Sequence, residues 1–522
     1  MLRKLDISFC FNYPVEHEEK GLTASFCIGV VFCNAAEALL KEGIRQMLRR
    51  VTKYLLLLLS LVLPLTIIPS CALPTAESVP VDTVGPVSPG PPVDPVSPDD
   101  PVDPEPTPAP DSPVSPEPPE VVTWRDVPSL WNVYENHFLI GNISSPGATI
   151  RGEGSAIMTE MFRYHYNAVT AENHFKPNAY TSGIYPDLTW NWGDKDNTMA
   201  WAKANGLQVA GHTLAWHSQS ADWLPCPRAP ASASVTRVEA RERLEQFIQT
   251  VAGRFDAMWD DSSPGGAGNM VAWDVVNEAH LERSTDWREN LRNENDGDDA
   301  SMWHRAYANG ADAAAGESGA DYIYDSFVLA RMYAPRATLY YNDFNCDNQV
   351  KTTAIANMTN ELNALWATDI VNNPQAKATY AGSFIEIVRE YLGDGGRLLI
   401  EGLGMQAHYN TRVDVRNVRR SLERYIDTGV KVSVTELDVT IASAHAGSNE
   451  EKIQARVYAG LFALYKEHSD HIERVTFWGL RDNLSWRAAN RPLIFSGEGD
   501  DFFAKEAFFA VLDPEGYLAA NK

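Results

Sequence analysis

Short apolar runs alternate with amphipathic helical stretches from about residue 121 to the end of the chain. The apolar runs have the length of β-strands and number eight: 138–142, 167–172, 207–213, 271–277, 338–343, 402–406, 432–437 and 475–480. The helical stretches among them are 197–205, 238–255, 323–333, 352–369, 383–392, 415–428 and 450–467. Regular strand–helix alternation is typical of a parallel β-sheet that is covered by helices.

Eight strand–helix units within residues 122–522 predict a single α/β domain, a (β/α)8 TIM barrel with long loops. The alternative is a doubly wound open sheet, which usually carries a glycine-rich or phosphate-binding loop after one strand. Neither G-x-G-x-x-G nor a Walker loop follows any of the predicted strands. The sequence therefore favours the barrel.

The chain changes composition sharply before the predicted barrel. Residues 47–71 begin with Met47, carry three basic residues and continue as an apolar run that Pro64 interrupts. A positive start, an apolar middle and small residues at the end indicate an export signal, and the run is short for a membrane-spanning helix. Because 46 residues precede this signal, we expect translation to start at Met47 and residues 1–46 to be a gene-model artefact or an untranslated extension.

The signal leads into a proline-rich segment, and two alternatives remain for the junction. The sequence predicts either a lipid anchor at Cys71 or ordinary cleavage near Ala72. Residues 72–120 contain 17 of the 32 prolines and ten acidic residues but no Lys or Arg. Such a segment cannot bury enough apolar surface to fold, so we expect a disordered linker over 72–121. The protein is therefore predicted to be exported, either secreted or lipid-anchored at the cell surface.

The net charge of the chain disfavours several classes of partner. The chain has 44 basic and 69 acidic residues and a net charge of −25, which disfavours nucleic acid and anionic membranes.

Six cysteines are too few for a disulfide scaffold. Cys226 and Cys346 are either free or paired, and we expect free thiols. The acidic stretch 293–299 lacks the spacing of a calcium loop, so the sequence predicts no metal site.

Polar residues stand where several predicted strands end, and two of them are glutamates. In a (β/α)8 barrel the carboxyl ends of the strands face one mouth, where active sites lie. Glu278 follows the fourth strand and Glu436 belongs to the seventh, so they come from opposite sides of the ring. Cleavage of a glycosidic bond needs one carboxyl group to protonate the leaving oxygen and another to attack or to activate water. The sequence therefore predicts Glu278 and Glu436 as a catalytic pair.

Seven motifs occur in a fixed order between residues 128 and 512. They are AENHFKP (171–177), GHTLAWHSQ (211–219), WDVVNEA (273–279), YNDFN (341–345), GMQAH (404–408), VTELD (434–438) and FWGLRDNLSWR (477–487). Together they resemble the family 10 glycoside hydrolases, the endo-1,4-β-xylanases. The resemblance implies that the barrel hydrolyses internal β-1,4-xylosidic bonds of xylan by a retaining double displacement. It further implies xylan and xylo-oligosaccharides as substrates, a monomeric catalytic domain and no cofactor.

The same resemblance implies roles around the bond that is cleaved. Glu278 is the general acid/base and Glu436 is the nucleophile. Asn277 hydrogen-bonds the 2-hydroxyl of the sugar at the cleavage point. His408, held by Asp438, touches Glu436 and keeps the nucleophile ionised.

Other substrate-binding residues are implied along the length of the cleft. Those that contact the glycone, on the non-reducing side of the bond, are Glu172, Asn173, Lys176, His212, Trp216 and Gln219. Gln406 lies beside the nucleophile, and Trp478 forms the floor of the site. Trp486 covers the sugar, and its bulk disfavours a hydroxymethyl group, so xylose is favoured over glucose.

One departure from the family pattern affects the leaving-group side of the cleft. Phe344 stands where the family usually has a tyrosine, so a stacking ring remains but the hydroxyl is lost. An alternative function is a β-1,4-glucanase or mixed-substrate hydrolase of the same fold. A tethered glycan-binding protein without activity is a further alternative, but it predicts replacement of Glu278 or Glu436, and both are present.

Overall fold

The structure is a computed structural model that describes residues 121–145, 155–225, 235–372, 397–442 and 449–521. It also describes the backbone of two antiparallel strands, β1 (Lys4–Pro14) and β2 (Thr23–Cys33), within a separate compact unit, Met1–Ser112. The proposed export signal at 47–71 and all but Val121 of the proposed linker lie outside the described residues. Those segments, and the origin of residues 1–46, stay predictions.

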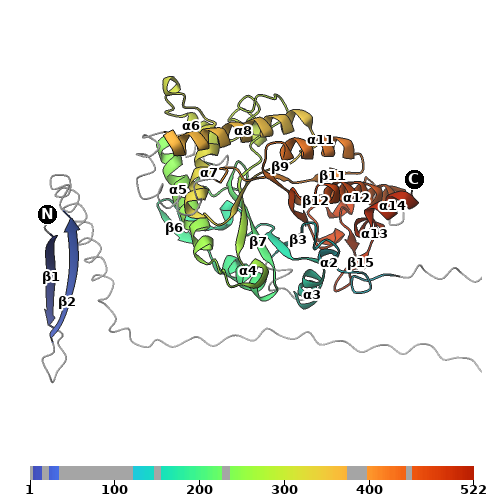
Figure 1. Cartoon of the computed structure of the whole chain (residues 1–522), viewed down its shortest axis with the longest axis horizontal. Helices are drawn as coiled ribbons and strands as arrows, with labels where there is room; N and C mark the ends of the chain where they lie inside the picture. Colours follow the sequence, from blue (N-terminus) through green and yellow to red (C-terminus); the bar gives the residue numbers. More distant parts are fainter. Residues whose placement is uncertain are drawn as a thin grey trace, which may run out of the picture. The chain divides into compact units, whose positions relative to one another are not determined.

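Eight parallel strands form a closed barrel in the second unit (Figure 1). Neighbouring strands in the ring follow their order along the chain, and pairing of β10 with β12 closes the sheet. The strands are β3 (Leu139–Ser144), β4 (Ala168–Ala171), β7 (Gln208–Trp216), β8 (Met270–Asn277), β9 (Thr338–Asp343), β10 (Gly402–Met405), β12 (Lys431–Thr440) and β13 (Ile472–Phe477). Each of the eight predicted strands is present, and the (β/α)8 TIM barrel is confirmed.

The barrel strands are buried on both faces, which explains their apolar sequences. All residues of β4 and β10 are buried, as are most residues of the other barrel strands. A strand that packs against side chains in the barrel interior and against helices outside has no solvent-facing side. Its sequence is therefore a continuous apolar run, and the polar residues concentrate at its end.

Helices surround the barrel. The helices are α2 (Leu130–Val133), α3 (Ser155–His165), α4 (Gly193–Ala204), α5 (Arg237–Ala257), α6 (Met302–Ala308), α7 (Asp321–Tyr333), α8 (Gln349–Asn372), α11 (Val415–Ile426), α12 (Asn449–Glu467), α13 (Glu506–Leu512) and α14 (Pro514–Ala520). Six of the seven predicted helices are present, and the seventh, 383–392, lies outside the described residues. The prediction did not include α2, α3 and α6, nor α13 and α14, which follow the last strand.

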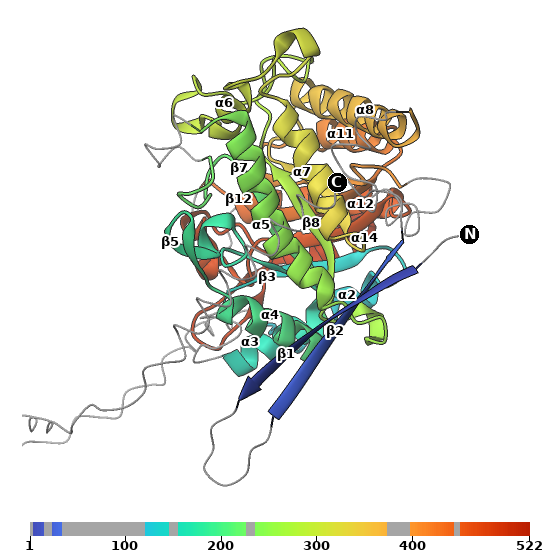
Figure 2. The ribbon, with the colours of Figure 1, turned by 90° about the vertical axis from the view of Figure 1, so that its left-hand side faces the viewer.

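Helix α5 shows how the sequence fixes one helix of the outer layer. Thr236 caps its first turn, and Thr236 and Glu239 form a reciprocal capping box. Its buried residues recur every three or four positions, from Ala240 through Leu244 to Phe255, so one face packs on the barrel. Figure 2 shows α5 and α7 running alongside each other over strand β8.

Short strands outside the barrel sheet extend the loops at its ends. The antiparallel pair β5 (Thr181–Ile184) and β6 (Asp187–Trp190) lies between β4 and α4. Strand β11 (His408–Asn410) pairs with the end of β12, and β14 (Phe495–Ser496) pairs with β15 (Phe503–Ala504). The sequence analysis did not predict these strands.

The described residues allow a search for membrane-spanning helices and show the state of one cysteine. No helix in this part of the chain combines the length and the apolar composition that a membrane crossing requires. Cys346 is buried as a free thiol, as predicted, and its Sγ donates to the carbonyl oxygen of Asp343 at 3.1 Å. Cys226 lies outside the described residues.

Candidate active site

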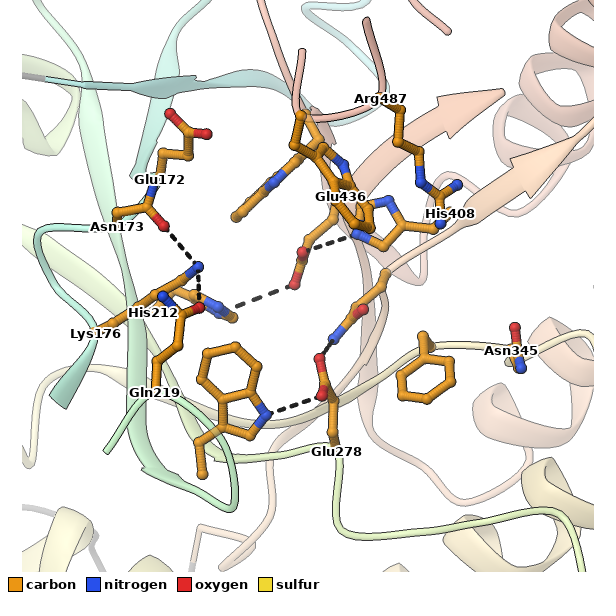
Figure 3. Close-up of a pocket in the computed structure, with 15 residues that line it drawn as sticks. Glu172, Asn173, Lys176, His212, Gln219, Glu278, Asn345, His408, Glu436 and Arg487 are labelled. Atoms are coloured by element: carbon orange, nitrogen blue, oxygen red, sulfur yellow. Dashed lines mark hydrogen bonds and ion pairs between the residues drawn. The ribbon is translucent and has the colours of Figure 1, made fainter. Parts of the chain in front are cut away.

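A pocket of about 510 Å³ is lined by residues that follow or end the barrel strands (Figure 3). Its lining residues are Glu172, Asn173, Lys176, His212, Trp216, Gln219, Glu278, Phe344, Asn345, Gln406, His408, Glu436, Trp478, Trp486 and Arg487. Thirteen of them are predicted site residues, contributed by seven separate segments of the chain. The carboxyl ends of the strands thus bring the predicted residues together at one mouth.

Glu278 follows directly after β8 in an unusual backbone conformation. Its φ is 57°, in the left-handed region that residues other than glycine rarely adopt. The carboxylate accepts hydrogen bonds from Trp216 Nε1 at 2.9 Å and from Gln406 Nε2 at 2.8 Å. Burial raises the pKa of Glu278, and the negative charges of Asp343 and Glu436 oppose the lowering effect of these two donors. Glu278 is therefore suited to hold a proton that it can donate.

The turn that carries Glu278 is held by groups behind the pocket. Tyr341 Oη accepts from the backbone nitrogens of Ala279 at 2.9 Å and His280 at 3.2 Å. Arg292 Nε donates to the carbonyl oxygen of Glu278 at 2.8 Å. These bonds fix the two peptide groups that follow Glu278. Contacts from outside the turn thus stabilise its strained backbone. Sequence reasoning assigned no such role to Tyr341 or Arg292.

Glu436 projects from β12 into the same pocket, with a different set of neighbours. Its carboxylate accepts from His408 Nε2 at 3.1 Å and from Asn342 Nδ2 at 2.9 Å, and His212 Nδ1 lies 3.9 Å away. Burial alone would raise the pKa of Glu436, but His212, His408 and Asn342 together bring it below its usual value. Glu436 is therefore held as a carboxylate, while Glu278 favours the protonated form.

His408 is fixed between two carboxylates. Its Nε2 faces Glu436, and its Nδ1 lies 3.0 Å from Oδ2 of Asp438. Although burial acts in the opposite direction, these carboxylates raise the pKa of His408 to about 9. Both ring nitrogens thus act as donors, and the imidazolium presents its positive charge to Glu436.

Asp438 also holds the cover of the pocket. Trp486 Nε1 donates to Asp438 Oδ2 at 3.0 Å, and Arg487 Nη1 lies 3.1 Å from Oδ1. The Arg487 guanidinium lies over the Trp486 ring at 4.4 Å from its centroid. The Trp486 side chain remains 58% exposed, so it covers one side of the pocket without closing it.

An amide network connects the two glutamates. Gln406 Nε2, which donates to Glu278, lies 3.3 Å from Asn277 Oδ1, and Asn342 Nδ2 donates to that same oxygen at 3.0 Å. Asn277 is buried behind the pocket wall and is not among the lining residues, unlike the other predicted substrate contacts. Its Nδ2 has no hydrogen-bond partner among the described residues. The contact of Asn277 with a sugar hydroxyl stays a prediction.

The predicted glycone contacts gather on one side of the glutamate pair (Figure 3). Lys176 Nζ donates to Asn173 Oδ1 and to Gln219 Oε1, both at 2.8 Å. Burial lowers the pKa of Lys176, against the pull of nearby carboxylates. Glu172 lies on the same side, where burial raises its pKa. The cluster offers donors and acceptors to the hydroxyl groups of a neutral ligand.

Phe344 and Asn345 line the pocket away from that cluster. Lys351 Nζ lies 3.9 Å from the centroid of the Phe344 ring, and Arg292 Cζ lies 5.5 Å from it. Both cations are buried, and their attraction to the ring holds Phe344 in place. An aromatic ring therefore remains on this side of the pocket, as predicted, without a tyrosine hydroxyl.

Sequence reasoning missed two lining residues and one partner of the nucleophile. Asn345 and Arg487 lie one residue after a predicted contact, in loops whose path a strand pattern does not specify. Asn342 belongs to the motif YNDFN, from which no role for it was predicted. His212, predicted as a contact, donates from Nδ1 to Asp274 at 2.9 Å, so Asp274 orients a pocket residue.

The described residues contain no group of three or more His, Cys, Asp or Glu side chains arranged to hold a metal ion. The histidines of the pocket are engaged with carboxylates instead. His212 contacts Asp274, and His408 contacts Glu436 and Asp438. These contacts place both imidazoles beside carboxylates.

Curated relatives are similar to this chain across most of the barrel. Endo-1,4-beta-xylanase A of Thermotoga neapolitana is 30% identical over 401 residues, which are 75% of this chain and 31% of that protein. Endo-1,4-beta-xylanase B of Paenibacillus barcinonensis is 28% identical over 404 residues, 74% of this chain and 98% of that protein. The chain thus spans less than a third of the Thermotoga protein but nearly all of the Paenibacillus one.

Solved structures show the same similarity. A GH10 xylanase from termite gut that contains a bacterial Ig-like domain has a TM-score of 0.58 and 29% identity, with 77% of this chain and 80% of that chain covered. An intracellular xylanase from Thermoanaerobacterium saccharolyticum has a TM-score of 0.57 and 27% identity, with 74% and 98% covered. The family model for glycosyl hydrolase family 10 matches residues 129–514. With that match over most of its length and the barrel described above, the chain belongs to glycosyl hydrolase family 10.

Proposed function

We propose that this protein is an endo-1,4-β-xylanase that hydrolyses internal bonds of xylan with retention of configuration. The observation that carries the proposal is the pair of glutamates in one pocket, with Glu278 favouring its proton and Glu436 its charge. A carboxyl group with a raised pKa provides the acid for glycosidic cleavage, and one with a lowered pKa provides the nucleophile. The names of the relatives support xylan as the substrate, and a mutant of the Thermoanaerobacterium xylanase has been solved in complex with xylotriose.

In the first step, the Glu436 carboxylate attacks the anomeric carbon while Glu278 donates its proton to the glycosidic oxygen. The bond between that carbon and oxygen breaks, which releases one part of the xylan molecule as an alcohol. The other part remains as an ester on Glu436. His408 and Asn342 both donate to Glu436, and they orient the attacking oxygen without removing its charge.

In the second step, Glu278 is a base. Formation of the ester removes the negative charge of Glu436, which is one of the influences that raise the pKa of Glu278. The Glu278 pKa therefore falls, and its carboxylate takes a proton from water as the water oxygen attacks the anomeric carbon. The ester bond breaks, Glu436 is again a carboxylate, and Glu278 is again protonated. One water is consumed for each bond cleaved.

Trp486 supports a preference for xylose over glucose. Its exposed ring, held by Asp438 and Arg487, lies beside the pocket and takes up the space that a hydroxymethyl group needs. We expect wild-type protein to release xylo-oligosaccharides from xylan at least about tenfold faster than it releases sugars from carboxymethylcellulose. Product chromatography on both polymers measures this. Faster release from cellulose would instead establish the β-1,4-glucanase alternative.

His408 sets the acid limb of the pH profile in this proposal. Activity requires ionised Glu436, so it is lost as pH falls through the Glu436 pKa, which His408 helps to lower. In His408→Asn that pKa rises, and we expect the acid limb of kcat/KM on an aryl xylobioside to move up by about one pH unit. The basic limb, which follows Glu278, stays in place. His304→Asn, on α6, is the control, and an acid limb that does not move in His408→Asn contradicts the assignment.

We also propose that the chain is exported and acts as a monomer on xylan outside the cell. The basic start and apolar run of residues 47–71 support export, and the proline content of 72–120 supports a spacer that separates the barrel from the signal. Mass spectrometry of the mature N-terminus distinguishes a lipid on Cys71 from cleavage near Ala72. The proposed catalytic pair and its hydrogen-bond partners all come from one chain, which supports a monomer.

A further inference from the structure

A buried cluster of hydrogen-bonding side chains lies behind the turn that follows β8. Its anchor is Asp343, the last residue of β9, which is completely buried. Oδ1 of this carboxylate forms an ion pair with Lys351 Nζ at 2.7 Å and accepts from the Phe344 nitrogen at 2.9 Å. Oδ2 accepts from the Tyr341 hydroxyl and, at 3.3 Å, from the His280 nitrogen. A buried carboxylate with partners on both oxygens is fixed in place.

The Tyr341 hydroxyl is the centre of this cluster. It has one hydrogen, which it donates to Asp343, and two lone pairs that can accept. The Ala279 nitrogen donates to the hydroxyl at 2.9 Å, and His280 Nδ1 lies 2.8 Å from it. Because the hydroxyl hydrogen is given to the carboxylate, the hydroxyl accepts from the imidazole. The ring hydrogen of His280 is therefore on Nδ1.

His280 is completely buried, and its ring meets the Tyr341 ring edge-on, with the two centroids 5.4 Å apart. Burial lowers the pKa of His280 to about 3, so the imidazole is neutral and carries a single hydrogen. Nε2 has no hydrogen-bond partner within the described part of the chain. The ring therefore uses its one hydrogen to hold the Tyr341 hydroxyl in the direction of Asp343.

The cluster acts on the turn of Glu278 through Ala279. Glu278 has a φ of 57°, and residues other than glycine keep such a conformation only where surrounding contacts hold it. The bond from the Ala279 nitrogen to the Tyr341 hydroxyl holds the peptide group directly after Glu278. The Glu278 side chain extends from this turn into the pocket, where Trp216 and Gln406 bond its carboxylate (Figure 3). The place of that carboxylate thus depends on the Tyr341 hydroxyl.

We propose that His280 and Asp343, acting through the Tyr341 hydroxyl, are positioning residues for the general acid/base. The inference rests on the proposed xylanase function and deepens it. Transfer of a proton to the leaving oxygen requires the Glu278 carboxyl group within hydrogen-bond distance of that oxygen. A small displacement of the turn therefore slows this step.

The nucleophile has contacts of its own. Glu436 accepts from His408 and Asn342, and neither bond involves the Tyr341 hydroxyl. Loss of the cluster should therefore slow protonation of the leaving group more than it slows the attack. A role that only stabilises the fold would change both steps alike.

Tyr341→Phe removes the hydroxyl and keeps the ring. The readout is kcat/KM on two aryl β-xylobiosides, because a phenyl leaving group needs a proton from Glu278 and dinitrophenolate leaves without one. We expect kcat/KM to fall about 30-fold or more for the phenyl xylobioside. For the dinitrophenyl xylobioside it should stay within about threefold of wild type. All measurements use the full chain.

Tyr134→Phe is the matched control. It also removes a buried hydroxyl that bonds a backbone group, here the Val511 carbonyl oxygen at 2.6 Å. Tyr134 lies at the end of α2 and does not line the pocket. Both kcat/KM values should therefore stay at the wild-type level in this variant.

Two variants of His280 test the imidazole itself and keep the test decisive if Tyr341→Phe is unstable. Leucine removes the donor to the Tyr341 hydroxyl, whereas asparagine places an amide nitrogen close to the position of Nδ1 and keeps that donor. We expect His280→Leu to lower the ratio of phenyl to dinitrophenyl kcat/KM about fivefold. His280→Asn should recover the wild-type ratio.

Equal changes on both xylobiosides in Tyr341→Phe, or a wild-type ratio in His280→Leu, would overturn the proposal. A His280→Asn variant that behaves like His280→Leu would overturn it as well, since the donor is then not the cause. The proposed xylanase function is judged separately, on the wild-type protein. If wild type hydrolyses neither xylobioside, that function is contradicted, whereas an unchanged ratio in the variants leaves it standing.

Discussion

Glu436→Gln is expected to lower kcat on xylan and on aryl xylobiosides by about 10⁴-fold or more. The amide that replaces the carboxylate cannot form the glycosyl ester, although it fits the same space between His408 and Asn342. The loss should therefore be equal for poor and activated leaving groups, since both require the attack. Initial rates with both substrate types measure it.

Glu423→Gln, which makes the same chemical change on the surface of α11, is the control for this variant. It should keep wild-type activity. Retention of most activity by Glu436→Gln would show that the nucleophile lies elsewhere. Equal thermal stability of the two variants would exclude unfolding as the cause of a loss.

Glu278→Ala is expected to separate the two steps of the reaction. On xylan, whose leaving oxygen needs a proton, the rate should fall by about 10³-fold. A dinitrophenyl xylobioside leaves without protonation, so its first step should remain fast and the ester on Glu436 should accumulate. Stopped-flow release of dinitrophenolate should then show a burst followed by a slow phase.

Azide provides the internal control for Glu278→Ala. This small anion fits the space left by the carboxylate and attacks the ester without a base, so it should accelerate the slow phase and yield a β-xylobiosyl azide. An equal loss on both substrates, with no effect of azide, would contradict the role of Glu278. The Gln406 and Trp216 side chains, which bond the carboxylate, remain in this variant.

The sequence was sufficient to predict the barrel and most of the pocket, for a physical reason. Barrel strands are buried on both faces and appear as apolar runs, and the polar residues that end them face one mouth. Glu278, Glu436 and Gln406 could be placed together on this basis, although they are far apart in the chain. The motifs then supplied roles that strand positions alone do not.

Other parts of the site depend on packing that no local pattern encodes. The hydroxyl of Tyr341 reaches the backbone behind Glu278 only in the folded barrel, and the amide network around Asn277 joins residues from three separate strands and loops. Arg487 reaches the pocket from a loop, where neither strand nor helix periodicity applies. The β5–β6 hairpin lies between a barrel strand and a helix and carries no barrel-strand signal in its sequence.

In the proposed reaction, Glu436 bonds covalently to the sugar while Glu278 exchanges its proton across the same pocket. Reaction of the wild-type protein with a 2-deoxy-2-fluoro-xylobioside that has an activated leaving group, followed by peptide mass spectrometry, tests it most directly. We expect one fluoroxylobiosyl adduct on the peptide that contains Glu436, and none in Glu436→Gln. An adduct on a different residue, or turnover that releases the α-anomer first without any adduct, would contradict it.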